Sequence, residues 1–558
     1  MSAPQPTMQE PVRIPLPPEF PIDWADAGLE MVPWQQDRQH LPEPVTPMSA
    51  WWAEHFAVGF SAGLAAYSVP LKVRTARLNT YYFMAQVPNV PPEQMPAMEA
   101  RAAELLPPGV GTFWSRWESE WLPELKRTWN DWSAVDVQGA DDASLRRHVD
   151  RAIEIYERAW TIHFELLIPA FVGISSFQDL YADLFPGRGA LDAYSLLRGG
   201  DNMSLETGRK LWELSRIAKA DPTLREVFET SASREIPARF EASPSGREFM
   251  TRLRDFLSFY GMRSDTVQEL ADPSWIEDPR PALDNLKAYI RQDEDPDVAH
   301  LHLAAERDRL IAEARDAIKG YPEAIRGQFE FLLAAGQFAS RVQEDHNFWI
   351  DQRCLHETRQ LCLDVGRRLD DRQQINEPGD IFMLSMDEAL DLLASGRDAT
   401  SLVASRRAEM DRWRKVTPPP MVGTDYGPPP ENPLTRAIFR FFGGPPQAHD
   451  SASELRGNAG SPGTVTGVAR VILNLQDGGR LEQGEILVTP TTSPPWTPLF
   501  ATAGGIVTDT GGALSHCAIV AREYGIPAVV GAAGATAMIR DGCTIEVDGD
   551  AGLVRIIS

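Results

Sequence analysis

The stretch Gly504–Gly531 reads GGIVTDTGGALSHCAIVAREYGIPAVVG and combines a short strand, a glycine turn and a helix. Ile506–Thr508 is a β-rich run, and Gly511–Gly512 follows it closely. The pattern predicts a helix that begins at Ser515–His516 and ends at Gly525–Pro527, because glycine closes a helix readily and proline cannot continue one. We therefore expect a strand that turns into a helix, with a histidine in the first helical turn.

This arrangement favours an anion beside the histidine. Glycines let the backbone approach a bulky group closely, and the N–H groups and dipole of a helix N-terminus attract phosphate. The same field disfavours an imidazolium, so His516 is expected to stay neutral and nucleophilic. We predict a phosphorylated His516, with Gly511, Gly512 and Ser515 supporting the phosphoryl group and Arg522 neutralising its charge. The same residues also fit a plain helix cap, with Arg522 in a surface ion pair.

Residues 463–558 form the predicted domain around this helix. Short β-rich runs separated by glycine turns predict a compact domain of mixed α and β structure. The predicted strands are Val468–Leu473, Glu485–Thr489, Gly505–Thr508, Ala528–Val530, Thr544–Val547 and Leu553–Ile557.

The preceding chain is expected to be a large, mainly α-helical domain over residues 51–415. Hydrophobic residues recur at helical spacing in Ala143–Phe171, and Glu330–Leu369 is a long helical stretch with polar residues in its middle. Asp201–Asn202 is a candidate helix cap. Residues 1–50, rich in proline and tryptophan, are predicted to be an extended arm.

Residues 416–462 are predicted to be a hinge linker. Two proline clusters, at residues 418–420 and 428–430, precede a short amphipathic piece, Leu434–Phe442, and a stretch rich in glycine, proline and serine. An ordinary surface loop is rarely this long. We expect stiff and flexible sections that let the C-terminal domain swivel.

Composition narrows the possible partners. The chain has 558 residues and a formal net charge of −25, which disfavours nucleic acid and anionic membrane surfaces as partners. Its 4 cysteines form no CxxC pair or disulfide framework, and no uninterrupted apolar run of about 18 residues occurs. We expect a protein of the reducing cytoplasm.

The C-terminal domain resembles the phosphohistidine, or mobile, domain of enzymes that use phosphoenolpyruvate. The resemblance is carried by Gly463–Val471 (GTVTGVARV), Thr489–Phe500 (TPTTSPPWTPLF), Thr508–His516 (TDTGGALSH) and Ala518–Gly531. It implies that His516 is the phosphorylated residue of a swivelling β/β/α domain. Dikinases of the family carry a regulatory threonine two residues before the histidine, where this chain has Leu514. Regulation by phosphorylation at that position is therefore not implied.

The helical region is similar, more loosely, to the substrate region of rifampin phosphotransferase. The similar segments are Phe20–His40, Leu196–Glu206, Tyr260–Pro279, Glu344–Arg353 and Glu377–Asp391. A substrate region and a phosphohistidine domain without an ATP-grasp domain resemble the large subunit of phenylphosphate synthase and related two-component phosphotransferases. The resemblance implies a separate ATP-grasp subunit that binds ATP and Mg²⁺, charges the histidine and releases AMP and phosphate. No cofactor is expected to bind tightly to this chain.

The predicted acceptor site lies around Glu344–His346. Transfer to a hydroxyl needs a proton acceptor and cations near the transferring oxygens. The sequence predicts His346 and Asp345 as catalytic residues, and Arg353 and Arg263 as cationic support for the phosphoryl group. The predicted substrate-binding residues are Glu344, Phe348, Trp349 and Arg359. Trp275 is a further candidate for an aromatic pocket.

These polar residues also fit a buried network that only holds helices together. Rifampin phosphotransferases have basic residues near the position of Glu344–Asn347, so the acidic run here disfavours rifampin as the acceptor. His40, His163, His300 and His302 lack the spacing of a metal site, and no metal ligand is predicted.

The leading interpretation is one subunit of a phosphotransferase that passes a phosphoryl group from His516 to a small phenolic or benzylic-type hydroxyl. Two alternatives remain open on the sequence. One is a phosphohistidine carrier that regulates by binding. The other is a condensing enzyme in which phosphorylation only activates one substrate for ligation.

Overall fold

The computed structural model describes residues 11–557, apart from residues 136, 138, 190, 265–267, 428, 430, 445–450, 452 and 493–495. The chain divides into two compact units. The first unit comprises Met1–Ile168, Thr266–Ala271 and Cys354–Thr435. The second unit comprises Pro169–Asp265, Asp272–Arg353 and Arg436–Ser558.

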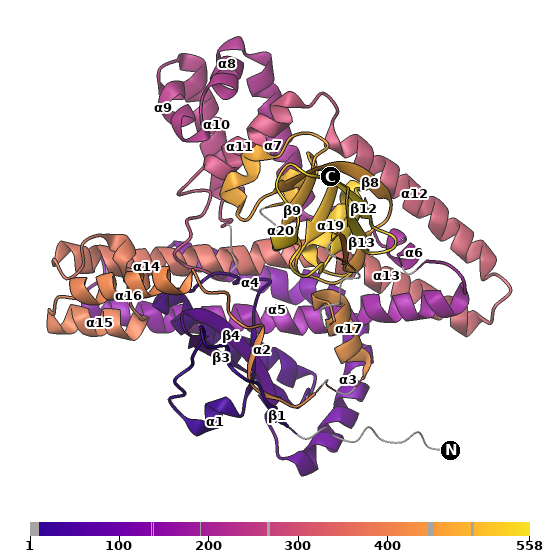
Figure 1. The fold of residues 1–558 in the computed structure, drawn as a ribbon, viewed down its shortest axis with the longest axis horizontal. Coiled ribbons are helices and arrows are strands. Elements are labelled where there is room, and N and C mark those ends of the chain that lie inside the picture. Colours follow the sequence, from indigo (N-terminus) through magenta and orange to yellow (C-terminus); the bar gives the residue numbers. More distant parts are fainter. Residues whose placement is uncertain are drawn as a thin grey trace. The chain divides into compact units, whose positions relative to one another are not determined.

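The first unit contains a 5-stranded sheet of order β1-β5-β2-β4-β3 (Figure 1). Its strands are β1 (Val12–Arg13), β2 (Pro33–Gln36), β3 (Leu71–Leu78), β4 (Tyr81–Pro88) and β5 (Met421–Asp425). The predicted extended arm and the predicted linker therefore both supply strands to this sheet, β1 and β2 from the arm and β5 from the linker. The hairpin β3–β4 lies inside the region predicted to be helical. It turns at Asn79 and Thr80, which both have positive φ angles, as type I′ hairpin turns require.

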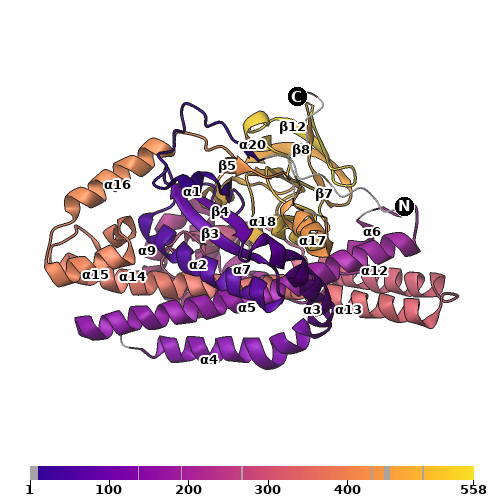
Figure 2. The same ribbon diagram turned by 90° about the horizontal axis from the view of Figure 1, so that it is seen from below.

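Helices form the remainder of the first unit. They are α1 (Ala27–Glu30), α2 (Pro47–Ala66), α3 (Met95–Arg116), α4 (Leu122–Ser133), α15 (Met386–Ser395), α16 (Thr400–Trp413), and parts of α5 (Asp142–Leu184) and α14 (Arg353–Asp371). In Figure 2, α4 runs alongside α5, and the two are joined by a 2.8 Å ion pair between Arg158 and Glu124. Helix α5 includes the predicted helix Ala143–Phe171. Its 18-residue hydrophobic window, with a mean hydropathy of 1.3, is 78% buried, as expected of a core helix.

In the second unit, α7 (Met203–Ala220), α8 (Pro222–Thr230), α9 (Ile236–Glu241), α10 (Pro244–Tyr260) and α11 (Arg280–Arg291) supply a core rich in aromatic and leucine side chains, which includes Trp212, Phe249, Leu283 and Tyr289. The unit also contains α6 (Asp192–Ser195), α12 (Pro296–Ala317) and α13 (Glu323–His346). Figures 1 and 2 show α12 and α13 as a helical hairpin, which an Arg315–Glu330 ion pair joins at 2.7 Å.

The predicted long helix, Glu330–Leu369, is confirmed and carries an irregularity. Helix α13 passes into a π-helical segment, Asn347–Gln352, before α14 begins. A π-helical turn adds a residue to the helix and rotates the side chains that follow. In a regular helix His346 and Arg353 would lie on the same face. The π-helical segment between them alters that arrangement.

The C-terminal domain is built on an 8-stranded sheet of order β6-β13-β12-β8-β9-β10-β11-β7 (Figure 1). Its strands are β6 (Glu454–Arg456), β7 (Asn458–Ser461), β8 (Thr464–Val471), β9 (Ile486–Thr489), β10 (Gly505–Thr508), β11 (Ala528–Val530), β12 (Thr544–Asp548) and β13 (Leu553–Ile556). Strands β8, β9, β10 and β11 are parallel neighbours. All six predicted strands are confirmed, with boundaries that differ at several ends.

Two hydrophobic cores cover the two faces of the parallel strands. Leu487, Ile506 and Val530 pack with α19 (His516–Tyr524) on one face, whereas Val488 and Val507 belong to the core on the other face. Strands buried on both sides are continuously hydrophobic, which explains why these runs were recognisable from the sequence. Helix α19 has the predicted bounds, and its C-terminal Gly525 adopts a φ of 66°.

The predicted linker contains ordered structure. Besides β5, it includes α17 (Pro433–Phe442), β6 and β7, and the last two strands belong to the C-terminal sheet. The amphipathic piece predicted at Leu434–Phe442 is confirmed as α17. Pro428, Pro430 and residues 445–450 lie outside the described part of the chain. The predicted domain boundaries at residues 415 and 463 stay a prediction.

The glycine turn before α19 supports a close contact with α17. A Cβ atom on Gly512 would overlap the Arg440 carbonyl and lie 2.6 Å from the Gly443 nitrogen. Replacing Gly512 by alanine is therefore expected to destabilise the second unit by about 1–3 kcal/mol, because backbone atoms cannot move aside cheaply. Chemical denaturation followed by circular dichroism measures this, with Gly200→Ala as the control, since a Cβ there meets nothing within 4 Å. Equal effects of the two substitutions would contradict the explanation.

Candidate functional site

His516 is the first residue of α19. Ser515 caps the helix, and its hydroxyl accepts a hydrogen bond from the Ala518 N–H at 3.4 Å. The side chain of His516 is 12% exposed, so it is largely enclosed but still reachable. Helix N-termini leave their first N–H groups without partners inside the helix. The predicted position of the histidine in a helix N-terminus is therefore confirmed.

The His516 ring is held by a carboxylate from another part of the second unit. Its Nδ1 lies 2.8 Å from Glu344 Oε1, on α13. Ser204, in the first turn of α7, donates its hydroxyl to Glu344 Oε2 at 2.5 Å. Three helices that are far apart in the sequence thus meet at one carboxylate.

This contact decides which ring nitrogen is nucleophilic. A carboxylate at Nδ1 accepts a hydrogen bond from Nδ1–H, which keeps the proton on that atom and leaves the lone pair on Nε2. The Thr497 hydroxyl lies 3.4 Å from Nε2, on the side of the ring where the lone pair is. The arrangement of carboxylate, imidazole and open nitrogen is the one that activates histidines as nucleophiles or bases.

Electrostatics keep Glu344 ionised. Burial alone would raise the pKa of Glu344, but the charge and hydrogen bond of His516, the Ser204 hydroxyl and His346 together hold it below its usual value. Glu344 was predicted to bind substrate. The structure places its carboxylate against the His516 ring, and the predicted contact with substrate stays a prediction.

The glycine loop before His516 makes hydrogen bonds to other parts of the second unit. Gly511 has a φ of 114°, which favours glycine, and its carbonyl accepts from the Asn458 side chain at 2.9 Å. The Gly512 N–H donates to the Phe441 carbonyl at 3.0 Å. The glycines thus form the tight turn that delivers His516, and their predicted contact with a phosphoryl group stays a prediction.

Arg522 is buried behind the loop. It donates to the carbonyls of Gly460 and Ala513 at 2.9 and 2.6 Å, and its guanidinium lies 4.4 Å from the Tyr194 ring centre. Burial lowers its pKa to about 10. These contacts favour a role in fixing the turn that carries His516, and the alternative of a surface ion pair is wrong.

Asp345 and His346 are next to Glu344 in the chain but have different surroundings. Asp345 Oδ1 accepts from the Met203 N–H at 2.9 Å and so stabilises the start of α7, while Arg341 lies 3.1 Å from its other oxygen. Burial raises the pKa of Asp345 to about 6. His346 Nδ1 donates to the Val342 carbonyl at 2.9 Å, and its Nε2 lies 3.8 Å from Asp351.

The predicted aromatic residues form a cluster in the second unit. Phe348 and Trp349 have ring centres 5.1 Å apart, and Phe259 lies 5.4 Å from Phe348. Tyr260 is 6.2 Å from Phe348 and donates its hydroxyl to Glu206 at 2.6 Å. The fully buried Arg263 lies 6.0 Å from the Phe348 ring centre.

The other two predicted arginines have separate positions. Arg353 Nη1 lies 2.9 Å from the Met262 sulfur in the second unit. Arg359 belongs to the first unit, where it donates to the Leu270 carbonyl at 2.5 Å and lies 4.8 Å from the Phe382 ring centre. The predicted roles of both arginines stay predictions.

The sequence analysis missed Ser204 and Thr497 as parts of the site. Ser204 lies in the first turn of α7, next to the predicted cap, which Asn202 forms by accepting from the N–H groups of Ser204 and Leu205. Thr497 lies within the quoted segment Thr489–Phe500, of which residues 493–495 are outside the described part of the chain. Thr497 could have been identified from the sequence because it lies in a segment that carries the resemblance to the mobile domain.

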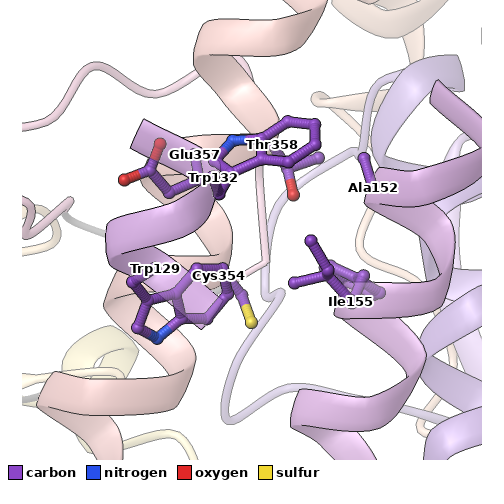
Figure 3. Close-up of a pocket in the computed structure, with 8 residues that line it drawn as sticks. Trp129, Trp132, Ala152, Ile155, Cys354, Glu357 and Thr358 are labelled. Carbon is purple, nitrogen blue, oxygen red and sulfur yellow. The ribbon is translucent and has the colours of Figure 1, made fainter. Parts of the chain in front are cut away.

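Each of the two units has a hollow among its described residues. One, in the first unit, is lined by indoles of α4, by α5 and by α14, with Trp129, Ile155 and Cys354 around it (Figure 3). The other lies in the second unit between α7, the start of α12 and the end of α19, and includes Tyr289, Glu523 and Tyr524. Neither of these two hollows is lined by His516.

Comparison with known proteins identifies the domain that carries His516. Residues 481–552 match the family model of the PEP-utilising enzyme mobile domain. The chain contains a PEP-utilising mobile domain. Residues 163–344, which end at the carboxylate that holds His516, match the fourth domain of rifampicin phosphotransferase. Both predicted resemblances are thereby confirmed.

Relatives extend the similarity beyond the mobile domain. Chondramide synthase cmdD of Chondromyces crocatus is 37% identical over 98% of this chain and 14% of its own length. The uncharacterized phosphotransferase YvkC of Bacillus subtilis is 30% identical over 72% of this chain and 48% of its own. A rifampicin phosphotransferase of the same organism is 29% identical over 64% of this chain and 40% of its own. The chain thus spans less than half the length of each relative.

Glu523, on the far end of the mobile-domain helix from His516, is another buried carboxyl. Its Oε2 accepts from the Gly199 N–H at 2.8 Å and lies 3.9 Å from His300 Nδ1. Burial raises the pKa of Glu523 to about 7, against the lowering effects of Gly199 and of two arginines. This carboxyl therefore keeps its proton in the folded chain at pH values where the unfolded chain has lost it.

Glu523 should make stability fall as pH rises. A folded pKa of about 7 lies above the unfolded value, so the stabilisation is complete in acid and is lost between about pH 4.5 and 7. Glu523→Gln should remove this dependence, which amounts to about 2–3 kcal/mol between pH 4.5 and 8. Urea denaturation at several pH values measures it, with the exposed Glu294→Gln as the control. A wild-type slope retained in Glu523→Gln would refute the assignment.

Proposed function

We propose that this chain is a phosphotransferase component that carries a phosphoryl group on His516 Nε2. The observation that carries the proposal is the 2.8 Å contact between His516 Nδ1 and Glu344. It leaves the lone pair on Nε2, the nitrogen that faces the Thr497 hydroxyl. The mobile domain and the relatives named phosphotransferases support the same reaction class.

The proposed chemistry has two displacements. In the first, the Nε2 lone pair attacks phosphorus in the donor, an N–P bond forms, and the P–O bond breaks with its electrons leaving on the donor oxygen. In the second, an acceptor hydroxyl oxygen attacks the phosphohistidine, and the N–P electrons return to Nε2. Glu344 holds Nδ1–H throughout and stabilises positive charge on the ring.

The acceptor hydroxyl must lose a proton in the second displacement. We retain His346 as the proposed proton acceptor. Its Nδ1 is committed to the Val342 carbonyl, so the proton would be taken at Nε2, 3.8 Å from the Asp351 carboxylate. Asp345 has a positioning role in this scheme, because it holds the start of α7, from which Ser204 reaches Glu344.

A small phenolic or benzylic-type alcohol is the proposed acceptor. The cluster of Phe259, Tyr260, Phe348 and Trp349 supports an aromatic substrate, since aromatic rings favour edge-to-face and offset contacts with one another. The predicted supporting role of Arg263 and Arg353 is part of the proposal.

ATP and Mg²⁺ are proposed to bind mainly to a separate ATP-grasp subunit. ATP supplies the phosphoryl group, with AMP and phosphate as the proposed products of charging. Free cysteines at positions 354, 362, 517 and 543 suit the reducing cytoplasm proposed as its location.

A condensing enzyme is the second candidate function. A relative named a synthase aligns with 98% of this chain. A similar segment therefore forms part of a longer protein whose name refers to synthesis. In that reaction the phosphoryl group would leave again when a second substrate attacks. The phosphohistidine step at His516 is common to both candidates.

Phosphate labelling tests the proposal. With a cognate ATP-grasp protein and β-labelled ATP, the wild-type chain should become labelled and His516→Ala should not. Glu344→Gln should slow labelling on the order of 10²-fold, because an amide accepts from Nδ1–H more weakly than a carboxylate does and can donate to Nδ1, which favours the tautomer without a lone pair on Nε2. Glu482→Gln, an exposed carboxyl in the mobile domain, is the matched control and should label at the wild-type rate.

Product analysis separates the candidate functions. A phosphorylated phenol recovered by mass spectrometry supports the phosphotransferase, and an unphosphorylated ligated product supports the condensing enzyme. A label that stays on His516 with every hydroxyl tested would favour a carrier. Equal labelling of wild type and His516→Ala would refute all three.

A further inference from the structure

Arg263 is a buried cation with most of its hydrogen-bonding capacity unused. It follows α10 in the second unit, and its side chain is 1% exposed. Nη2 donates to the Thr207 hydroxyl at 2.5 Å. Among the described residues, Nε and Nη1 have no hydrogen-bond partner. Buried guanidinium groups normally have carboxylate, carbonyl or phosphate acceptors.

Trp275 adds a third buried donor beside Arg263. Its ring is 1% exposed, and the Arg263 guanidinium carbon lies 5.7 Å from the ring centre. The indole Nε1–H likewise has no acceptor in the described part of the chain. An indole and a guanidinium are donors only, so these unpaired groups can be satisfied only by an acceptor such as an oxygen.

The surroundings of Arg263 explain why the protein itself does not fill this role. Glu344 and Tyr260 act on Arg263 electrostatically. However, the Glu344 oxygens accept from His516 and Ser204, and the Tyr260 hydroxyl donates to Glu206. The near edge of the aromatic cluster, Phe348, contributes a ring face at 6.0 Å. Arg263 thus lies close to one of the rings proposed to bind the acceptor and within electrostatic reach of the carboxylate that orients His516.

We propose that Arg263 and Trp275 form a subsite for an anionic oxygen group next to the reaction centre. This inference rests on the proposed function for the nature of the ligand. Two sources of such an oxygen fit the position: a carboxylate carried by the aromatic acceptor, or the phosphoryl group delivered by His516. In either case the ligand supplies the acceptor atoms that Arg263 Nε and Nη1 and Trp275 Nε1 lack.

If Arg263 forms this subsite, removing its guanidinium should weaken anion binding without lowering the stability of the fold. A buried cation without a full set of acceptors is unfavourable, so replacing it by a hydrophobic residue of similar size is expected to be neutral or stabilising. An arginine that merely holds helices together would behave in the opposite way. Arg216 provides that comparison, because it lies 3.6 Å from the Trp212 ring centre and donates to the Gln292 carbonyl at 2.9 Å.

The experiment uses the full chain without nucleotide or partner, so its outcome does not depend on phosphorylation. Binding of 4-hydroxybenzoate, 4-hydroxybenzamide and inorganic phosphate is measured by isothermal titration calorimetry for wild type, Arg263→Met, Arg263→Lys and Arg216→Met. Thermal unfolding of each variant is recorded in parallel. The amide matches the benzoate in shape but lacks its charge, and phosphate stands for the phosphoryl source.

The wild type is expected to bind 4-hydroxybenzoate or phosphate, and whichever binds identifies the source. Arg263→Met should weaken that binding at least about tenfold with an unchanged or higher melting temperature. Arg263→Lys should also weaken it, because an ammonium cannot reproduce the planar donor set. Arg216→Met should bind normally and melt at a lower temperature.

Three results would overturn the subsite. One is that neither anion binds the wild type at millimolar concentration. Another is that 4-hydroxybenzoate and the amide bind equally while phosphate does not bind. The third is that both Arg263 variants keep full anion affinity. If the anion binds as expected but His516 is never labelled, the subsite stands and the proposed function fails.

Discussion

One hydrogen bond, 2.8 Å long, joins His516 Nδ1 to Glu344 Oε1, and the site in the second unit depends on it. A histidine at a helix N-terminus is common, but a histidine whose Nδ1 faces a buried carboxylate has one defined tautomer and one reactive nitrogen. Neighbouring residues hold the Glu344 carboxylate and the start of α7 in place. Asn202 starts α7, Ser204 in its first turn reaches Glu344, and Asp345 accepts from the Met203 N–H of the same turn.

Buried charge is the second constraint on this region. Glu344 and Glu523 are buried carboxyls, whereas Arg263 and Arg522 are buried guanidinium groups. Glu344 stays ionised because His516 and Ser204 meet it, but Glu523 has weaker partners and its pKa rises to about 7. Arg522 is satisfied by carbonyls, while Arg263 is not. Arg263 is therefore a buried cation with spare donors among the described residues, and it lies close to the Phe348 ring and under the electrostatic influence of Glu344.

Local signals allowed much of the C-terminal domain to be predicted. Each parallel strand is a short hydrophobic run buried on both faces, and α19 ends where Gly525 and Pro527 end it. Strands that depend on distant partners were missed. Strand β2 pairs with β5, almost 400 residues away in the chain, so neither run carries enough information by itself to show that it belongs to a sheet. The hairpin β3–β4, by contrast, has a local signal, because Asn79 and Thr80 at its turn both have positive φ angles.

The sequence by itself determined that His516 begins a helix after a glycine turn and that its domain is a PEP-utilising mobile domain, because strand, turn and helix cap are encoded within some thirty consecutive residues. It also pointed to the acidic run Glu344–His346. Only the tertiary structure decided which of these three residues is hydrogen-bonded to His516. Consecutive residues of a helix point about 100° apart, so three adjacent polar side chains face three different surroundings. Packing alone brings Glu344 to His516, although the two are 172 positions apart in the chain, and it turns Asp345 toward α7 and leaves His346 beside Val342 and Asp351.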